Sequence, residues 1–275
     1  MKKLIALLLA GCMMATMVVG CGSKEEAAEA PAVTEEAAEA QSDLAYVKEK
    51  GTLVVGITDF APMDYKNEDG EWIGFDADMA KFFAGELGVD VEFVEIDWDN
   101  KILELDAKSI DCVWNGMTLT DEVKAAMDCS NAYCNNAQVV VVPTEKAQEY
   151  QTVESLEGLA FAVEAGSAGE AEVTALGLDC TPVKAQSDAL MEVAAGTSDA
   201  AVIDALMAAA MVGPDTGYAD LTYTVSLNSE EYGVGFRKGS DLVAELNAFF
   251  ADIYADGTMQ DIAATYGVDA AVVAQ

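Results

Sequence analysis

The sequence predicts an α/β protein with two lobes, each built on a largely parallel β-sheet that helices cover on both faces. Three observations support this prediction. Strand-like runs alternate with helical periodicity along the chain, and the pattern restarts after Pro143. The stretch from Leu44 to the end, about 230 residues, is large for one hydrophobic core and comfortable for two. Clefts between such lobes are usual ligand sites.

Four strands and three helices are expected in the first half of the chain. The strands are expected over residues 52–58, 89–96, 111–114 and 137–142, and the helices over residues 75–87, 99–108 and 120–127. Apolar residues at helical spacing predict one buried face for the first helix, and Gly88 is expected to end it. These apolar residues are Phe75, Met79, Phe82, Phe83 and Leu87.

The second half repeats the alternation. Strands are expected over residues 159–163, 200–203, 223–225 and 234–236, and helices over residues 166–176, 187–195 and 205–211. Ser187 is expected to cap the second of these helices. A longer helix is expected from Leu242 to a stop at Gly257, followed by a final helix that contains Met259 and Tyr266.

The N-terminus has the composition of an export signal. Lys2 and Lys3 precede an apolar run over residues 4–19 that is too short for a comfortable membrane span, and small residues follow it. Cys21, directly after residues 18–20 (Val-Val-Gly), resembles the acylated cysteine of a bacterial lipobox. Residues 1–20 are therefore expected to be a lipoprotein signal peptide, with a lipid on Cys21 that anchors the protein outside the cytoplasm at the cell membrane. An ordinary signal peptide that contains a cysteine is the alternative.

Residues 21–43 are rich in alanine and glutamate and show no apolar stripe. Because the glutamates repel one another, this segment is expected to be a disordered or weakly helical linker. It would hold the globular part of the protein away from the membrane.

The charge of the chain is strongly negative, with 14 lysines and arginines against 49 aspartates and glutamates, a formal net charge of −35. This excess argues against nucleic acid or an anionic membrane face as a partner, and it suits a cationic or zwitterionic ligand. There is no histidine, which excludes histidine metal sites and histidine-based catalytic triads. Arg237 is the single arginine.

Four cysteines remain after Cys21: Cys112, Cys129, Cys134 and Cys180. Their spacing contains no CxxC pair, so free buried thiols are expected, with a bridge between Cys129 and Cys134 as the alternative. The spacing also gives no reason to expect zinc or any other metal. No cofactor is expected.

Seven short segments follow one another in a characteristic order. They are residues 51–56, 59–62 with Tyr65, 74–78, Asp111 with 115–120, 166–167, Asp199 with Asp204, and 232–239. In this order, behind a lipobox, they resemble the extracellular solute-binding proteins of polar amino-acid ABC transporters, known as solute-binding family 3. The resemblance covers residues 44–268.

The resemblance implies a two-lobed periplasmic-binding-protein-like clamshell of type II, in which the chain crosses twice between the lobes. Lobe 1 is expected to span residues 44–135 and 226–275, and lobe 2 residues 136–225, with the crossings near residues 134–138 and 221–226. Closure of the lobes on a small molecule presents a surface to the permease subunits in the membrane. A monomer that performs no chemistry is expected.

The resemblance also assigns roles to residues of the first lobe. Phe60 matches the aromatic residue that covers the ligand, and Trp98 falls at a ligand-facing position; core packing is the alternative for both. Asn115, Gly116 and Thr118 match ligand-binding positions, where amides and hydroxyls can donate to a carboxylate. A plain turn is the alternative for these three residues.

In the second lobe, the resemblance points to Ser167 and Asp204. The Ser167 hydroxyl and the free amides at the helix start suit an anionic group, although a simple N-cap explains the serine as well. Asp204 matches the aspartate that pairs with the ligand's α-ammonium, and a buried carboxylate needs such a partner or hydrogen bonds. Asp59 and Glu164 are expected to flank the same cleft, with solvated loop positions as the alternative.

An arginine expected from the family is missing. In relatives it follows the Thr-x-Thr segment and binds the ligand's α-carboxylate with a fork of two hydrogen bonds, but Val123 stands here. Lys124 lies about 100° further around the helix, and Arg237 belongs to a distant strand. Either helix-start amides and hydroxyls hold the carboxylate, or the ligand is not a standard α-amino acid.

The resulting hypothesis is a lipid-anchored binding protein that captures a small amino acid, or a related amine-bearing solute, for an ABC importer. A ligand-sensing lipoprotein that feeds a receptor is an alternative that the sequence does not separate from transport. A dehydratase-like enzyme on the same scaffold is a weaker alternative. Asp59 and Asp204 are acids that such an enzyme would need, but the missing arginine removes an anchor for its substrate.

Overall fold

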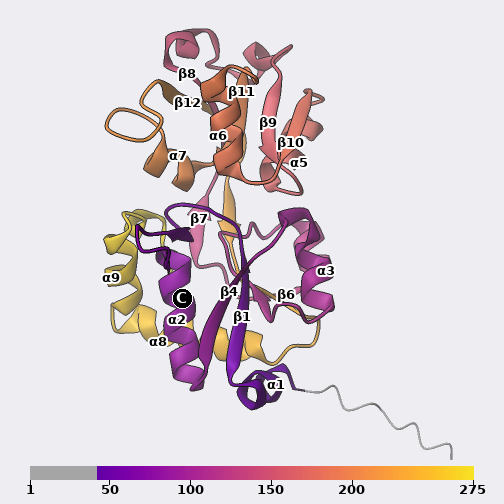
Figure 1. Ribbon diagram of the computed structural model, residues 1–275, viewed down its shortest axis with the longest axis vertical. Helices are drawn as coiled ribbons and strands as arrows, with labels where there is room; N and C mark the ends of the chain where they lie inside the picture. Colours follow the sequence, from indigo (N-terminus) through magenta and orange to yellow (C-terminus); the bar gives the residue numbers. More distant parts are fainter. Residues whose placement is uncertain (1–41) are drawn as a thin grey trace, which may run out of the picture. The chain divides into compact units, whose positions relative to one another are not determined.

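The computed structural model describes residues 42–275, which belong to one compact unit spanning Ala40–Gln275 (Figure 1). The predicted signal peptide (residues 1–20), the predicted lipidation site Cys21 and nearly all of the predicted linker (residues 21–43) lie outside the described residues. The described part begins with helix α1 (Asp43–Lys50), which the Ser42 hydroxyl caps by accepting a hydrogen bond from the Ala45 amide at 2.9 Å. No helix within residues 42–275 has the length and apolar character needed to cross a membrane.

The first sheet has the strand order β4-β1-β5-β14-β6. Its strands are β1 (Thr52–Ile57), β4 (Asp90–Glu95), β5 (Cys112–Val113), β6 (Asp128–Cys129) and β14 (Gly235–Phe236). Strand β1 pairs in parallel with β4 and β5, whereas β14 pairs antiparallel with β5 and β6. Leu53, Val55 and Ile57 are completely buried, which is typical of an interior strand in a sheet covered by helices.

Besides α1, five helices belong to the part of the chain around this sheet. They are α2 (Phe75–Leu87), α3 (Lys101–Asp106), α4 (Asp121–Ala126), α8 (Leu242–Ala255) and α9 (Thr258–Thr265). Helix α9 packs against α2 and α8 (Figure 1). As predicted, α2 ends at Gly88, which has a left-handed conformation with φ of 75°. Thr120 caps α4, because its hydroxyl accepts a hydrogen bond from the Val123 amide.

One residue predicted for the buried face of α2 lies outside it. Phe82 is 37% exposed, whereas Phe83 is 1% exposed. Successive residues of a helix are separated by about 100°, so one of two neighbouring phenylalanines must lie at the margin of the apolar face. The Phe82 ring packs edge-on against Phe249 of α8, with 5.2 Å between the ring centroids.

The second sheet has the strand order β10-β9-β11-β8-β12. Its strands are β8 (Gln138–Pro143), β9 (Phe161–Glu164), β10 (Cys180–Val183), β11 (Ala200–Asp204) and β12 (Leu221–Ser226). Strand β9 pairs in parallel with β10 and β11, whereas β8 pairs antiparallel with β11 and β12. Both sheets are therefore mixed rather than largely parallel. The chain enters the second sheet by β8 and leaves it by β12, which requires these two strands to run in opposite directions.

Three helices follow strands of the second sheet: α5 (Ala168–Ala175), α6 (Gln186–Ala195) and α7 (Ala205–Met211). The prediction that Ser187 caps α6 is wrong. Helix α6 begins at Gln186, and the Asp188 carboxylate accepts a hydrogen bond from the Ala185 amide at 3.2 Å. The Asp188 carboxylate thus provides an acceptor for a backbone amide at the helix start, and the helix begins one residue before Ser187.

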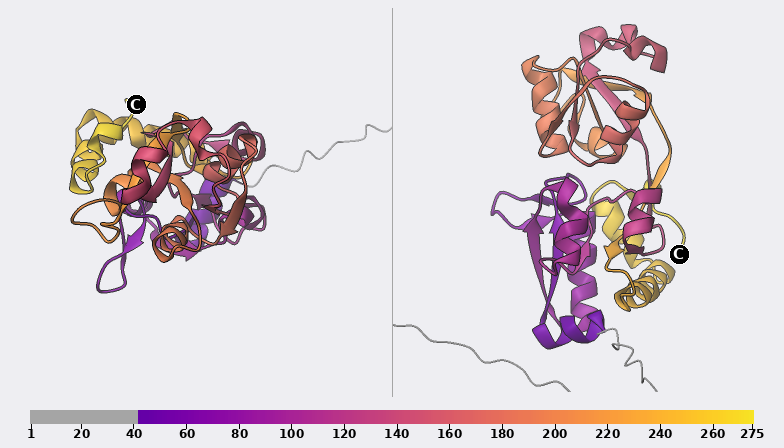
Figure 2. Two further views of the ribbon diagram at one scale, coloured as in Figure 1. Left: turned by 90° about the horizontal axis from the view of Figure 1, so that it is seen from above. Right: turned by 90° about the vertical axis from the view of Figure 1, so that its right-hand side faces the viewer.

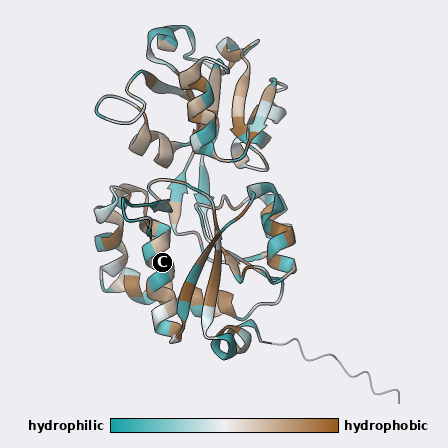
Figure 3. Ribbon diagram, viewed as in Figure 1, coloured by the Kyte–Doolittle hydropathy of each residue, from teal (hydrophilic) through white to brown (hydrophobic). Residues whose placement is uncertain are grey.

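A two-stranded ribbon connects the two sheets. It pairs β7 (Cys134–Asn136) antiparallel with β13 (Glu230–Tyr232), so the chain crosses once through β7 and returns through β13 (Figure 2). Figure 3 shows hydrophilic colour along β7, in contrast to the apolar strands of the sheets. The two crossings agree with the predicted fold class, whereas the exact lobe boundaries stay a prediction.

The remaining short elements lie in connections. They are the hairpin of β2 (Tyr65–Lys66) and β3 (Trp72–Ile73) and the 3-10 turns η1 (Trp98–Asn100), η2 (Thr144–Glu149), η3 (Val153–Leu156) and η4 (Asp269–Ala271). Turn η1 leads directly into α3, so the single helix predicted over residues 99–108 begins as a 3-10 turn and continues as an α-helix.

The four cysteines of the described chain are free thiols. Cys112 and Cys134 are buried, but Cys129 and Cys180 are half-buried. The prediction of buried thiols is therefore right for two of the four.

Candidate functional site

A cavity of about 680 Å³ is lined by residues of both sheets and their connections. Ligand sites of this kind have volumes of roughly 300–1,000 Å³. Seven of the eight ligand-contacting residues predicted from the sequence line this cavity. They are Phe60, Trp98, Asn115, Gly116, Thr118, Ser167 and Asp204.

Asp59, the eighth residue, does not line this cavity. It is exposed and lines a separate cavity of about 350 Å³ together with Lys66 and Trp72. Asp59 and Phe60 are neighbours in an extended segment, so their side chains point in different directions.

Phe60 and Gly116 form an apolar wall of the cavity. Phe60 is 2% exposed and packs edge-on against the Tyr232 ring, with 6.3 Å between centroids. Gly116 has φ of 53°, and a Cβ atom at this position would lie 2.4 Å from the Phe60 ring. Glycine is therefore needed here for both its backbone conformation and its lack of a side chain.

The donors of Asn115 and Gly116 already have partners within the protein. The Asn115 side chain exchanges hydrogen bonds with Thr58 and donates to Asp64 Oδ2 at 2.7 Å. The Gly116 amide donates to Asp76 Oδ2 at 2.7 Å. These two residues shape the wall of the cavity, and their donors are occupied by the protein itself.

Thr118 and Ser167 differ in the hydrogen bonds that they leave unused. The Thr118 hydroxyl donates to Glu230 Oε1 at 2.9 Å. The Ser167 hydroxyl caps α5 by accepting from the Glu170 amide at 3.1 Å, which leaves its own hydrogen available as a donor toward the cavity.

Asp204 ends β11 and is held by a network of side-chain donors. Its Oδ1 accepts hydrogen bonds from Asn136, from Gln138 at 3.0 Å and from the Tyr232 hydroxyl at 2.6 Å. Its Oδ2 accepts one hydrogen bond, from Gln186. The carboxylate is 4% exposed, so the network fixes its position at the cavity.

Lys101 is a cavity residue that the sequence reasoning missed. It is 8% exposed, its Nζ lies 4.8 Å from the centre of the Trp98 ring, and it donates to the backbone oxygens of Trp98 at 3.2 Å and Gly166 at 2.9 Å. The signal was its spacing, because Trp98, Lys101 and Leu105 share one face of the helical segment. A lysine on an apolar helix face predicts a buried cation, and a buried cation indicates a structural or ligand-binding role. Gln138 and Gln186 were missed as well.

Val123 is the residue found where the sequence resemblance leads us to expect an arginine. It is 5% exposed and lines the cavity, while Lys124 is exposed and does not line it. Lys101 is the one lysine or arginine among the described residues that line the cavity.

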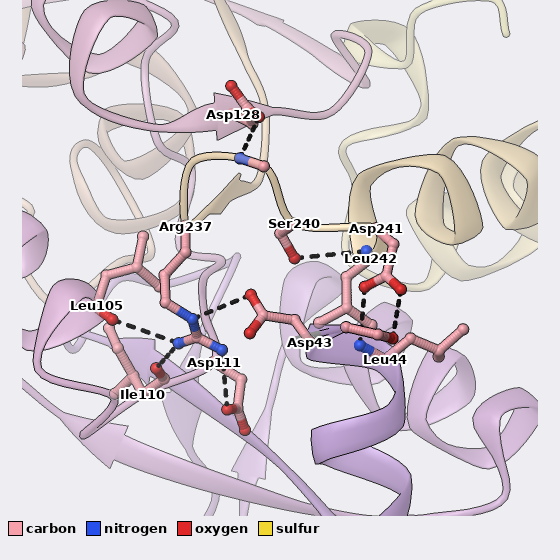
Figure 4. Close-up of polar contacts among 12 residues, drawn as sticks. Asp43, Leu44, Leu105, Ile110, Asp111, Asp128, Arg237, Ser240, Asp241 and Leu242 are labelled. Carbon is pink, nitrogen blue, oxygen red and sulfur yellow. Dashed lines mark hydrogen bonds and ion pairs between the residues drawn. The ribbon is translucent and has the colours of Figure 1, made fainter. Parts of the chain in front are cut away.

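Arg237 is engaged elsewhere, in a buried cluster directly after strand β14 of the first sheet (Figure 4). Its Nε pairs with Asp43 at 3.0 Å, and its terminal nitrogens reach Asp111 at 3.5 Å and the Ile110 carbonyl at 2.8 Å. As the sequence predicted, this arginine is no substitute for the missing one.

Burial shifts the titration of three cavity residues. Burial, and after it the charge of Asp204, raises the pKa of Glu164 to about 8. Burial, and after it the charge of Glu230, raises the pKa of Asp204 to about 7. Burial also lowers the pKa of Lys101, and the negative charge of Glu164 opposes this shift. Ionisation of these buried carboxyl groups is costly in the empty protein. A cationic ligand would stabilise the ionised form, so the cavity favours such a ligand.

The unliganded protein is expected to lose stability as the pH rises from about 5 to about 8. Glu164 and Asp204 hold protons in the folded state at pH values where the unfolded chain has released them, so their stabilisation is complete at acidic pH and is lost through their raised pKa values. We expect the free energy of unfolding in urea to fall by a few kcal/mol across this range. The measurement should be made in about 0.5 M salt, which screens the repulsion among surface carboxylates and leaves the effect of the two buried groups. A free energy that stays constant or increases would contradict this prediction.

Residues 53–269 match the family model of bacterial extracellular solute-binding proteins, family 3. The chain belongs to this family. The L-cystine-binding protein TcyJ of Escherichia coli is 30% identical over 218 residues, which cover 78% of this chain and 82% of TcyJ. The family predicted from the sequence motifs is thereby confirmed.

Solved structures confirm the clamshell fold of this family-3 protein. A variant of arginine-bound ArgBP from T. maritima is 34% identical with a TM-score of 0.72, over 76% of this chain and 99% of that one. An ancestral amino-acid-binding protein, a precursor of cyclohexadienyl dehydratase, is 31% identical with a TM-score of 0.75, over 82% of this chain and 99% of that one. TcyJ and ArgBP are binding proteins, whereas the ancestral protein connects the scaffold to an enzyme.

Proposed function

We propose that this family-3 protein is the substrate-binding component of an ABC importer and that it captures a small amino acid or related amine-bearing solute. The observation that carries the proposal is the meeting of buried charges in one cavity. Asp204 offers a carboxylate to the α-ammonium group of the ligand, Glu164 is a second acid of the same lining, and Lys101 offers a cation to the α-carboxylate. One relative is named as an L-cystine-binding protein and another was solved with arginine bound, and both support the same class of ligand.

Lobe 1 would comprise residues 44–135 and 226–275, and lobe 2 residues 136–225. Strands of the first sheet all come from the former segments, and strands of the second sheet come from the latter apart from Ser226, the last residue of β12. Several contacts join the lobes: among them, Lys101 donates to the Gly166 carbonyl, the Tyr232 hydroxyl donates to Asp204 at 2.6 Å, and Lys184 pairs with Glu95 at 3.4 Å. These contacts support closure of the lobes around a ligand.

A lipid on Cys21 would keep the protein at the membrane beside its permease subunits. The linker of residues 21–43 would let it move while it keeps a high effective concentration there. The variant Cys21→Ser is expected to move from the membrane fraction to the soluble fraction. Retention of this variant at the membrane would remove the anchor from the proposal.

The proposal is tested by thermal-shift and calorimetric screens of ligand-free protein against amino acids, amines and short peptides. At least one amino acid is expected to raise the melting temperature and to bind with one-to-one stoichiometry. Absence of binding across all three classes would contradict the proposal.

Lys101→Met is expected to weaken binding of the amino-acid ligand by roughly tenfold or more, because the carboxylate loses its buried cation. Binding of the corresponding decarboxylated amine should change much less. Calorimetry on both ligands separates loss of the carboxylate contact from general damage to the cavity. The matched control is Lys124→Met, which removes an exposed lysine outside the cavity. An equal loss for both ligands would contradict this role of Lys101.

A dehydratase-like activity is the second candidate, favoured by the ancestral relative. Two acids with raised pKa values are suitable for acid–base chemistry. Incubation with prephenate-like cyclic acids tests this candidate, and stable substrate would dismiss it. A sensing role is distinguished from transport by the neighbouring genes, because an adjacent permease and ATPase favour uptake.

A further inference from the structure

Glu164 is a buried carboxylate whose bonding capacity the protein leaves partly unused. It ends β9, it is 2% exposed, and it lines the cavity. Its Oε1 atom has no hydrogen-bond partner among residues 42–275. Since a buried carboxylate without partners is costly, this atom indicates a group that the ligand supplies.

No cation of the described chain pairs directly with Glu164. None of the ion pairs within 4.0 Å among residues 42–275 involves Glu164. Lys101 lines the same cavity, but its ammonium donates to the carbonyl oxygens of Trp98 and Gly166 instead. Thr58 and Gln186 lie close enough to favour the ionised form, yet both are neutral. The Glu164 carboxyl group therefore has no cation in contact with it among the described residues.

Asp204 has a different environment, although it lines the same cavity. Four side chains donate to its two oxygens, three of them to Oδ1. Oδ2 accepts one hydrogen bond and has capacity for one more, as contact with an α-ammonium requires. The two carboxylates thus provide two separate acceptors, one at Asp204 Oδ2 and one at Glu164 Oε1.

The balance of buried charge says which kind of ligand uses both acceptors. In the empty protein, burial raises the pKa of Glu164 and Asp204, and bound protons cancel their charge. When both carboxyl groups are ionised, as contact with cationic groups of a ligand requires, the buried charged residues of the lining are these two and Lys101, which leaves one negative charge in excess. A zwitterionic amino acid with a neutral side chain leaves this excess unchanged. An amino acid with a cationic side chain removes it. The remaining acids of the lining are exposed or half-exposed, so water solvates them.

We infer that Glu164 binds a cationic group of the ligand other than its α-ammonium, and that the cavity therefore selects amino acids with a positively charged side chain. This inference rests on the proposed function, in which Asp204 binds the α-ammonium and Lys101 the α-carboxylate.

The test compares wild type with Glu164→Gln by calorimetry, using pairs of ligands matched in length. Arginine is paired with citrulline, and lysine with 2-aminoheptanoic acid, in which a methyl group replaces the terminal ammonium. The wild type is expected to bind the cationic member of at least one pair about tenfold or more tightly, and Glu164→Gln is expected to lose most of that preference. Affinity for the neutral member should change by less than about threefold.

The matched control is Glu122→Gln, which neutralises an exposed acid of the same lining and should keep the preference. Glu164→Met provides a second neutral variant of similar length if the glutamine variant does not fold. An unchanged preference in a folded Glu164 variant, or equal affinities in the wild type, would overturn the inference alone. Failure of the wild type to bind any amino acid would overturn the proposed function and the inference with it.

Discussion

Replacing Asp204 with alanine is expected to weaken ligand binding by about 2–5 kcal/mol, the range measured when one partner of a buried charge pair is removed. The ammonium of the ligand would then enter a cavity in which its carboxylate partner is absent. Gln138, Gln186 and Tyr232 would also lose their shared acceptor. Calorimetry on the ligand found by screening measures the loss, which corresponds to at least roughly thirtyfold in the dissociation constant.

Asp59→Ala is the matched control for this variant. The sequence motifs predicted both aspartates for the site, but the structure places Asp59 in a separate cavity. Its replacement is expected to leave affinity nearly unchanged. If Asp59→Ala weakened binding as much as Asp204→Ala, or if Asp204→Ala had no effect, the assignment of the ammonium site would be wrong.

The second large effect is expected in stability rather than binding. Arg237→Met should lower the free energy of unfolding by about 3–5 kcal/mol, because a broken buried ion pair leaves an uncompensated charge. Asp43 would lose its partner, and the carbonyl oxygens of Leu105 and Ile110 would lose their donor. Asp111 would keep one cation, since Lys50 lies 2.6 Å from its Oδ2 atom.

Urea unfolding followed by circular dichroism measures this effect. Lys238→Met is the control, because the Lys238 side chain is 51% exposed and pairs with Asp128 at the surface. Surface pairs contribute about 0–1 kcal/mol, so the control should be several times milder. Equal destabilisation by the two variants would show that the buried cluster has no special role.

Helix α2 shows what the sequence predicts well. Its ends depend on local signals, since Gly74 precedes the first turn and Gly88 ends the last one in a left-handed conformation. The two-residue strands β6 and β14 are different. Each depends on pairing with chain segments that are distant in sequence, so local pattern predicted β14 as part of a longer run and did not predict β6.

The cavity follows the same division. The order of the sequence motifs predicted residues that line the cavity, because these motifs lie at the ends of strands and the fold brings strand ends together. It did not predict that Asn115 and Gly116 would donate to Asp64 and Asp76, because those bonds depend on the tertiary arrangement. Lys101 was not predicted because it lies in a different helix from Val123, and only the tertiary arrangement brings the two residues to one cavity.

Native mass spectrometry of ligand-free protein in a competitive mixture tests the central claim most directly. The mixture would contain equal amounts of the twenty standard amino acids, two diamines, a sugar and a dicarboxylic acid without an amine. We predict that the wild type retains one molecule of an amino acid and that Asp204→Ala retains none. Retention of the sugar or of the dicarboxylic acid, or retention of no solute by the wild type, would contradict an amino-acid site built on Asp204, Glu164 and Lys101.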